Sequence, residues 1–413
     1  VFGCQQVLIN DNKQLTNILE FICSEANKLT NCGIYYARQV WFKIRKYLGK
    51  FDLINEYKRN SHYQVLHSQA AQQTLLAVRE SFKSYYELDK KFRNGELEFR
   101  PKLPNYRKKD GLAVVSYPKQ ALKLIDNSLQ IPLGLTVGRW FGLKNFSVTM
   151  PPNLKFEDIK ELRILPRNRR FYLEFVYKLE SEKANVDFNK VLGIDHGLDN
   201  WLTCISNVDT SIIVDGKHLK SLNQFYNKQV STIKEKKPQG FWSNKLAAIT
   251  EKRNRQMRDA VNKAARLMIN HCLVHQIGTI VFGWNQRQKD SSSMSKINNQ
   301  KFVSIPTAKL KNRIAQLCEQ YGLRFVETEE SYTSKASFVD NDFLPTFGEK
   351  TEGWKSSGKR THRGLFRTKF NQYINADANG AANILRKVST TLDLDLSEVS
   401  SGALTTPLRI ALW

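Results

Sequence analysis

The sequence predicts a multidomain α+β protein, in which a β-rich region interrupted by helices precedes an α/β layer. Its 413 residues exceed what one compact core holds, so several domains are expected. Helical periodicity comes first, short β-type runs follow, and the last part alternates strands with helices. The boundaries that these changes indicate are 1–11 with 95–185 for the β-rich region, 12–94 for the helical insertion, 186–331 with 371–390 for the α/β layer, 332–370 for a segment inserted in it, and 391–413 for a tail.

The helical insertion shows one apolar stripe whose members recur at spacings of four and three, which places them on one helix face. The runs after it, such as "LAVVSY" and "FYLEFVY", are separated by Pro and Gly, and they predict a β-barrel or a strongly bent sheet. The opening "CQQVLIN" also has a strand pattern, so the helices are expected to interrupt a β domain. The stripe consists of Ala71, Leu75, Val78, Phe82 and Tyr85.

The α/β layer begins with three strands in succession and continues with alternating helices and strands. That order predicts a mixed sheet. The expected elements are strands at 191–195, 204–207 and 211–216, a helix at 241–275, a strand at 278–285, a helix at 306–322, a strand at 323–330 and a short helix at 375–387.

Charge is the most informative global property. Lys and Arg number 64 against 39 Asp and Glu, which gives a net charge of +25. This excess favours a polyanionic partner, because it is larger than solubility requires. No stretch of about 18 apolar residues could span a membrane, and no secretion signal is visible. The six cysteines form no C-x-x-C pair, which argues against a disulfide framework and fits a reducing compartment. We therefore expect an intracellular, cytoplasmic protein, and a nucleic-acid partner would associate it with the nucleoid.

Carboxylates at strand ends are the candidate catalytic groups, because functional side chains of α/β sheets gather there. Asp195 ends the first strand of the layer, Glu327, Glu329 and Glu330 end the last, and Asp377 opens the final helix. Taken alone, each could be an ordinary turn former or a helix N-terminal acid. Together they have the donor chemistry of a nuclease that holds two Mg²⁺ ions about 3.5–4 Å apart.

Three motifs then point to a family. "GIDHGLDNWLT", "ESYTSKAS" and "INADANGAANILRK" resemble, in the right order, the motifs of TnpB, the transposon-encoded RNA-guided nuclease related to type V CRISPR effectors and to Fanzor proteins. The resemblance implies a wedge β-barrel with an inserted helical recognition domain, followed by a RuvC-like domain of the ribonuclease H type. It also implies Mg²⁺, a structured guide RNA and a double-stranded DNA target.

Two positions depart from the common TnpB pattern. The second acid is usually carried by the strand that here ends at Gly283, whereas a Fanzor-like subset carries it just before the Tyr-Thr-Ser-Lys stretch, where Glu330 stands. We therefore expect Asp195, Glu330 and Asp377 to be catalytic and to bind metal, with Glu329 as the alternative, since successive strand residues face opposite ways. The inserted segment 332–370 has no cysteine, so a degenerate zinc ribbon without zinc is expected.

Two basic sets are candidates for nucleic-acid contact. In the loop after the helical insertion, an aromatic residue among cations could stack a base while its neighbours neutralise phosphates. On the helix 241–275 an ordinary solvated face is the alternative. The first set is Lys102, Tyr106, Arg107, Lys108 and Lys109, and the second is Lys252, Arg253, Arg255 and Arg258.

The predicted function is an RNA-guided DNA endonuclease of a transposable element. Its guide would pair with target DNA beside a short flanking motif that the protein reads, and Mg²⁺-dependent hydrolysis would cut the DNA. Two alternatives remain open. A guide-bound DNA-binding repressor with an inactive nuclease is suggested by Gly283, and a DNA transposase could use the same fold.

Overall fold

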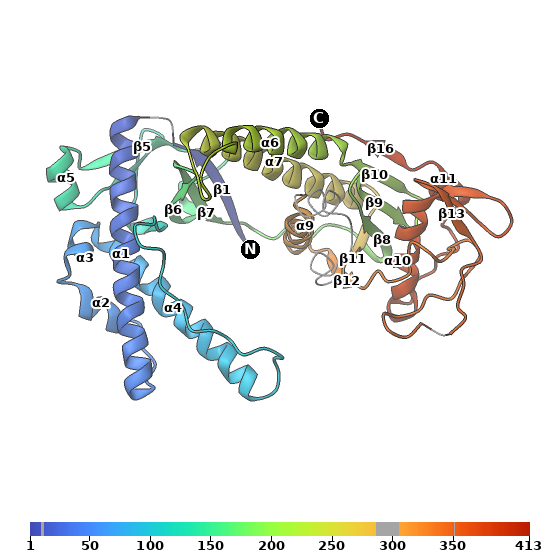
Figure 1. Ribbon diagram of the computed structural model, residues 1–413, viewed down its shortest axis with the longest axis horizontal. Helices are drawn as coiled ribbons and strands as arrows, with labels where there is room; N and C mark the ends of the chain where they lie inside the picture. Colours follow the sequence, from blue (N-terminus) through green and yellow to red (C-terminus); the bar gives the residue numbers. More distant parts are fainter. Residues whose placement is uncertain (10–11, 286–304, 351) are drawn as a thin grey trace. The chain divides into compact units, whose positions relative to one another are not determined.

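The computed structural model describes residues 1–9, 12–285, 305–350 and 352–413. They form two compact units, Val1–Leu179 and Glu180–Trp413, and each unit contains both helices and strands (Figure 1). The multidomain α+β class expected from the sequence is therefore observed. Among the described residues, no helix is both long enough and apolar enough to cross a membrane.

The first unit contains two separate antiparallel sheets. The four-stranded sheet has the order β1-β7-β6-β2, so the strand at the start of the chain pairs with the last strand of the unit. No closed barrel is found among the described residues, which corrects the expected barrel. The physical reason is that β3, β4 and β5 pair only with one another. The strands are β1 (Phe2–Leu8), β2 (Val115–Pro118), β3 (Lys123–Ile125), β4 (Ser128–Pro132), β5 (Asn145–Thr149), β6 (Ile159–Arg167) and β7 (Arg170–Lys178).

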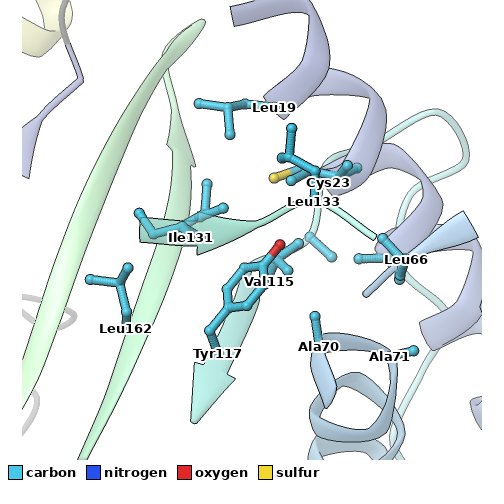
Figure 2. Close-up of a cluster of buried hydrophobic side chains, with 14 of the residues drawn as sticks. Leu19, Cys23, Leu66, Ala70, Ala71, Val115, Tyr117, Ile131, Leu133 and Leu162 are labelled. Atoms are coloured by element: carbon cyan, nitrogen blue, oxygen red, sulfur yellow. The ribbon is translucent and has the colours of Figure 1, made fainter. Parts of the chain in front are cut away.

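Five helices accompany these sheets in the described part of the first unit, and they share a core with the strands. Figure 2 shows Leu19 and Cys23 of one helix and Ala70 of another beside Val115 and Ile131 of the two sheets. A separate helical domain at 12–94 stays a prediction, because this cluster joins helices and strands. The helices are α1 (Lys13–Ile44), α2 (Asp52–Tyr57), α3 (Ser61–Val65), α4 (Ser68–Arg93) and α5 (Leu135–Phe141).

The second unit is built on the mixed sheet that the sequence predicts, with the order β12-β11-β8-β9-β10-β16. The first three strands in this order are mutually parallel, whereas β8, β9 and β10 form antiparallel pairs. The strands are β8 (Asp187–His196), β9 (Asn200–Ser206), β10 (Ser211–Asp215), β11 (Ile277–Gly283), β12 (Arg324–Thr328) and β16 (Leu408–Ile410).

Helices cover both faces of this sheet. On one face α7 (Asn244–Val274) and α9 (Thr307–Tyr321) form a core with Leu192 and Ile194, and α6 (Lys217–Lys234) joins them. On the other face α10 (Ala376–Leu392) packs against Val191 and Val281, so the sheet lies between the helices (Figure 1). Side chains alternate along a strand. Asp195, four residues after Val191, therefore belongs to the α10 face.

The inserted segment 332–370 contains a β-hairpin. Strands β13 (Lys359–His362) and β14 (Leu365–Arg367) pair with each other, and β15 (Tyr373–Asn375) extends them into a three-stranded sheet. Asp340 and Asp342 organise the loop beside it. Asp340 accepts a hydrogen bond from the Lys369 amide at 2.9 Å, and Asp342 accepts one from the Ser337 amide at 2.7 Å. The short helix α11 (Ser401–Thr405) precedes β16.

Candidate active site

Close contact between α10 and β8 creates the site. A methyl group at Gly193 of β8 would lie 2.6 Å from Cγ of Leu385 and 2.8 Å from the backbone oxygen of Ala381. Both distances are too short for a van der Waals contact, so the atoms would clash. The absence of a side chain therefore lets the helix approach the strand closely. Alanines at 378, 381 and 382 complete the narrow contact. The first turn of α10 is thereby brought to the strand end that carries Asp195.

The start of α10 carries Asp377 in its first turn and contacts Asp195. Asn375 caps the helix, because its side chain accepts hydrogen bonds from the amides of Asp377 and Ala378 at 3.0 and 3.1 Å. A methyl group at Gly380 would lie 2.9 Å from Oδ2 of Asp195. The carboxylate thus occupies the space that this glycine leaves open.

Glu330 lies beside the position from which an acid is missing. Strands β11 and β12 are parallel, and Gly283 is in register with Thr328. A methyl group at Gly283 would lie 3.3 Å from Oε2 of Glu330 and 2.4 Å from Cδ1 of Ile384. Because strand β12 ends next to Gly283, a carboxylate just beyond it reaches the space that an acid on β11 would use.

The Tyr-Thr-Ser-Lys stretch holds the backbone of Glu330 in place. Thr333 donates its hydroxyl to the Glu330 carbonyl at 2.8 Å, and the Glu330 amide donates to Oδ1 of Asn285 at 3.1 Å. Asn383 of α10 in turn donates to the Thr333 carbonyl at 2.9 Å. This motif therefore connects the end of β12 to α10.

The three predicted carboxylates influence one another electrostatically. Burial raises the pKa of Asp195 well above its usual range, and the negative charges of Glu330 and Asp377 raise it further, while Arg360 opposes them. Within the part of the chain that the structure describes, no three His, Cys, Asp or Glu side chains already surround a point where a metal ion could sit. The donors are nevertheless hard oxygens, as Mg²⁺ requires.

Glu329 and Glu327 have other partners. The Glu329 carboxylate accepts hydrogen bonds from the Lys387 ammonium and from the Ser331 amide, the latter at 2.9 Å. Burial raises the pKa of Glu329, but these hydrogen bonds outweigh burial and the net pKa is lowered. Glu327 pairs with Lys311. Glu330 is therefore the glutamate whose charge acts on Asp195. The alternative, Glu329, is instead hydrogen-bonded to Lys387 of α10.

Three further residues contact these carboxylates, and sequence reasoning did not assign them. Asn200 donates to Oδ2 of Asp377 at 2.7 Å, and Arg360 of β13 donates to its Oδ1 at 3.1 Å. Nε2 of His196 lies 3.7 Å from Oε2 of Glu330, and its ring stacks on Phe282. His196 and Asn200 lie within the first motif, and this position could have identified them as candidate site residues. Arg360 is one of many cations in the insertion, and nothing in the sequence distinguishes it.

The basic loop of the first unit lies along α1. Asn27 donates to the Lys108 carbonyl at 3.1 Å, and Asn31 accepts from the Arg107 amide at 2.8 Å. Further along the same helix, Arg38 donates to the Pro104 carbonyl at 2.9 Å and lies 5.5 Å from the centre of the Tyr106 ring. These contacts fix the backbone of the loop while its candidate side chains face solvent. The exposed candidates are Lys102, Tyr106, Arg107, Lys108 and Lys109.

The four candidates on α7 divide into two pairs. Arg253 donates to Asn223 of α6 at 2.8 Å, and Arg258 forms an ion pair with buried Glu251 at 3.0 Å. These two cations therefore serve contacts within the protein. Lys252 and Arg255 are exposed, and they are the α7 candidates that a nucleic acid could reach.

Comparison with known proteins gives the fold first. The chain shares its fold with the structure described as "Cryo-EM structure of the Cas12f1-sgRNA-target DNA complex". The TM-score is 0.61 and the identity 16%, and the similarity covers 90% of this chain and 83% of that one. A structure described as the "mini-RNA-guided endonuclease CRISPR-Cas_phi3" is similar with a TM-score of 0.44 and 10% identity, covering 98% and 94%. No curated protein matches.

A family model matches part of the second unit and the end of the first. Residues 174–288 match the model of OrfB_IS605, described as "Probable transposase". This region contains β8, β9, β10 and β11 and thus the first motif with Asp195. The TnpB resemblance inferred from the three motifs is confirmed by this match and by the shared fold.

The crowding at Gly283 gives a prediction about stability. Gly283→Ala is expected to lower the free energy of unfolding by about 1–3 kcal/mol, because the new methyl group would overlap Cδ1 of Ile384. In an Ile384→Val background, which removes that atom, the same substitution should cost clearly less. Urea denaturation of the four proteins measures both costs. Equal costs in the two backgrounds would show that Ile384 is not what excludes a side chain at position 283.

Proposed function

We propose that this protein is an RNA-guided DNA endonuclease of a transposable element, with a RuvC-like nuclease of the ribonuclease H type. One observation carries the proposal: Asp195 at the end of β8 lies against the first turns of α10, which begins with Asp377, and Glu330 lies against Gly283 and His196 of the two neighbouring strands. An α/β sheet with acids gathered at its strand ends is suited to phosphodiester hydrolysis. The OrfB_IS605 match and the shared fold support the same class.

Asp195, Glu330 and Asp377 would hold the Mg²⁺ ions. Burial raises the pKa of Asp195 most, and the negative charges of Glu330 and Asp377 raise it further. A divalent cation would offset this accumulation of negative charge. When bound, two Mg²⁺ ions supply an activated water and stabilise the leaving oxygen. The chain's own residues orient the ligands: Asn200 and Arg360 each hold one oxygen of Asp377, and Gly380 leaves the space in which Asp195 sits.

The nucleic-acid partners proposed are a structured guide RNA and double-stranded target DNA. The net charge of +25 supports them, as does the Cas12f1 structure of the same fold, which was determined with single-guide RNA and target DNA. The loop at 102–109 offers an exposed aromatic ring between cations on a fixed backbone. Such a loop can stack a base and neutralise phosphates at the same time.

A second candidate function is a DNA transposase, which the description of the matching family favours. A third, the guide-bound repressor, is motivated by Gly283. The proximity of Glu330 to that position weighs against the third candidate, because it supplies a carboxylate where the strand itself has none.

One experiment separates the three candidates. The protein is purified with its bound RNA and incubated with a guide-matched plasmid library in Mg²⁺, alongside Asp195→Asn and an EDTA control. The proposal predicts guide-dependent cutting by wild type, with binding but no cutting by Asp195→Asn or in EDTA. Binding without cutting by wild type would establish the repressor, and joining of transposon ends without RNA would establish the transposase.

A further inference from the structure

Asn200 joins the candidate active site to the tail strand β16. Its Nδ2 donates to Oδ2 of Asp377 at 2.7 Å, and its Oδ1 accepts a hydrogen bond from Arg409 at 2.8 Å. The same guanidinium forms an ion pair with Asp215 of β10 at 2.9 Å. Three segments far apart in the sequence thus meet at one side-chain amide.

The chemistry of these partners fixes the direction of the amide. A guanidinium can only donate hydrogen bonds, so the Asn200 side chain must turn its oxygen to Arg409. Its NH₂ group is then directed to Asp377, which as a carboxylate can only accept. Asp377 and Arg409 therefore favour the same orientation of the amide. Without Arg409, the amide would keep one hydrogen bond instead of two and would be held less firmly against Asp377.

The tail is seated well enough to hold this cation in place. Strand β16 pairs in parallel with β10, and Arg409 is in register with Ile213. Ile410 and Leu412 pack against the core shared with α7 and α9. Arg409 is also the only Lys or Arg in residues 391–413, so no neighbour in the tail could replace it. The forked guanidinium contacts Asp215 and Asn200 together, which a lysine ammonium cannot reproduce as well.

We propose that Arg409 and Asn200 are positioning residues, through which the tail strand orients the Asp377 carboxylate for a divalent metal ion. Asn200 acts on the carboxylate directly, and Arg409 acts through Asn200. The tail strand is then part of the active site rather than only an edge of the sheet. This inference rests on the proposed function, because it assumes that Asp377 is a metal ligand.

The test measures Mn²⁺ binding by calorimetry and guided DNA cutting for the RNA-bound protein. Loss of a group that orients a metal ligand typically lowers metal affinity or activity 10–100-fold. In Asn200→Ala, the Mn²⁺ affinity and the cutting rate should therefore both fall by about that factor. In Arg409→Met they should fall by about 10-fold, and Arg409→Lys should recover part of this loss. Lys228→Met, an exposed site on α6, controls for the removed charge. Asp215→Asn removes the ion pair but leaves the hydrogen bond between Arg409 and Asn200 in place, and its loss should be clearly smaller than that of Arg409→Met.

The double variant Asn200→Ala/Arg409→Met decides whether the two residues act as one unit. It should match Asn200→Ala alone, because Arg409 has nothing left to orient. Additive losses of Mn²⁺ affinity in the double variant, or an Arg409→Met protein with unchanged affinity, would overturn the inference. So would a loss in Asp215→Asn as large as that in Arg409→Met, because it would show that Arg409 merely anchors the strand. Melting temperatures of all variants establish that they are folded. If the wild-type protein neither binds Mn²⁺ nor cuts DNA, the proposed function itself is wrong. This result differs from failure of the inference, in which wild type is active and the variants do not behave as expected.

Discussion

Glu330→Gln is expected to abolish cutting of a guide-matched target, with a loss of at least about 10³-fold, equivalent to ~4 kcal/mol of transition-state stabilisation. The substitution keeps the shape of the side chain but removes the charge beside Gly283 and Asp195. A neutral amide is a poor Mg²⁺ ligand compared with a carboxylate. Binding of the target should be unchanged, since the loss concerns only the chemical step. Single-turnover cutting and a gel-shift assay measure the two quantities separately.

The neighbouring residue supplies a matched control. Glu329→Gln makes the same chemical change one residue away, at a carboxylate that contacts Lys387 and Ser331. We expect this variant to cut within a few-fold of wild type and to lose some stability through the weakened Lys387 contact. If Glu329→Gln abolishes cutting while Glu330→Gln does not, the two roles are reversed. If both variants cut normally, the second acid lies elsewhere in the chain.

Gly193→Ala is expected to lower the free energy of unfolding by about 3 kcal/mol, at the upper end of the range for overpacked cores. The added methyl group would meet both Leu385 and the backbone oxygen of Ala381, so α10 must move away from β8. Since the same helix carries Asp377, displacement of α10 also separates Asp377 from Asp195. We therefore expect cutting to fall even at temperatures where the variant remains folded. Urea denaturation and cutting rates measure these effects.

Two comparisons make this second prediction specific. Gly402→Ala in α11 adds a methyl group whose nearest neighbour is the hydroxyl of Ser400 at 3.3 Å, and its stability should remain close to that of wild type. Leu385→Ala combined with Gly193→Ala should not restore stability, because the contact with the Ala381 backbone oxygen remains. A Gly193→Ala protein as stable and active as wild type would mean that α10 does not need this close contact.

The sequence predicted the local elements well because their signals are local. Short apolar runs and helical apolar spacing indicated most strands and helices of the second unit, and the succession of three strands followed by alternating helices and strands predicted the mixed sheet that is observed. Asp195, Glu330 and Asp377 could be selected because strand ends and helix starts are positions that a sequence reveals. Their catalytic roles remain part of the proposal.

Tertiary structure alone decided what depends on segments far apart in the chain. No local pattern shows that β3, β4 and β5 pair among themselves instead of closing a barrel. Nor does it show that Arg253 and Arg258 serve contacts within the protein, or that Arg409 reaches Asn200. The sequence by itself thus determined most of the elements, the resemblance to TnpB and the candidate acids. The partners of each charge were settled only by packing, because a side chain's neighbours depend on how distant segments come together.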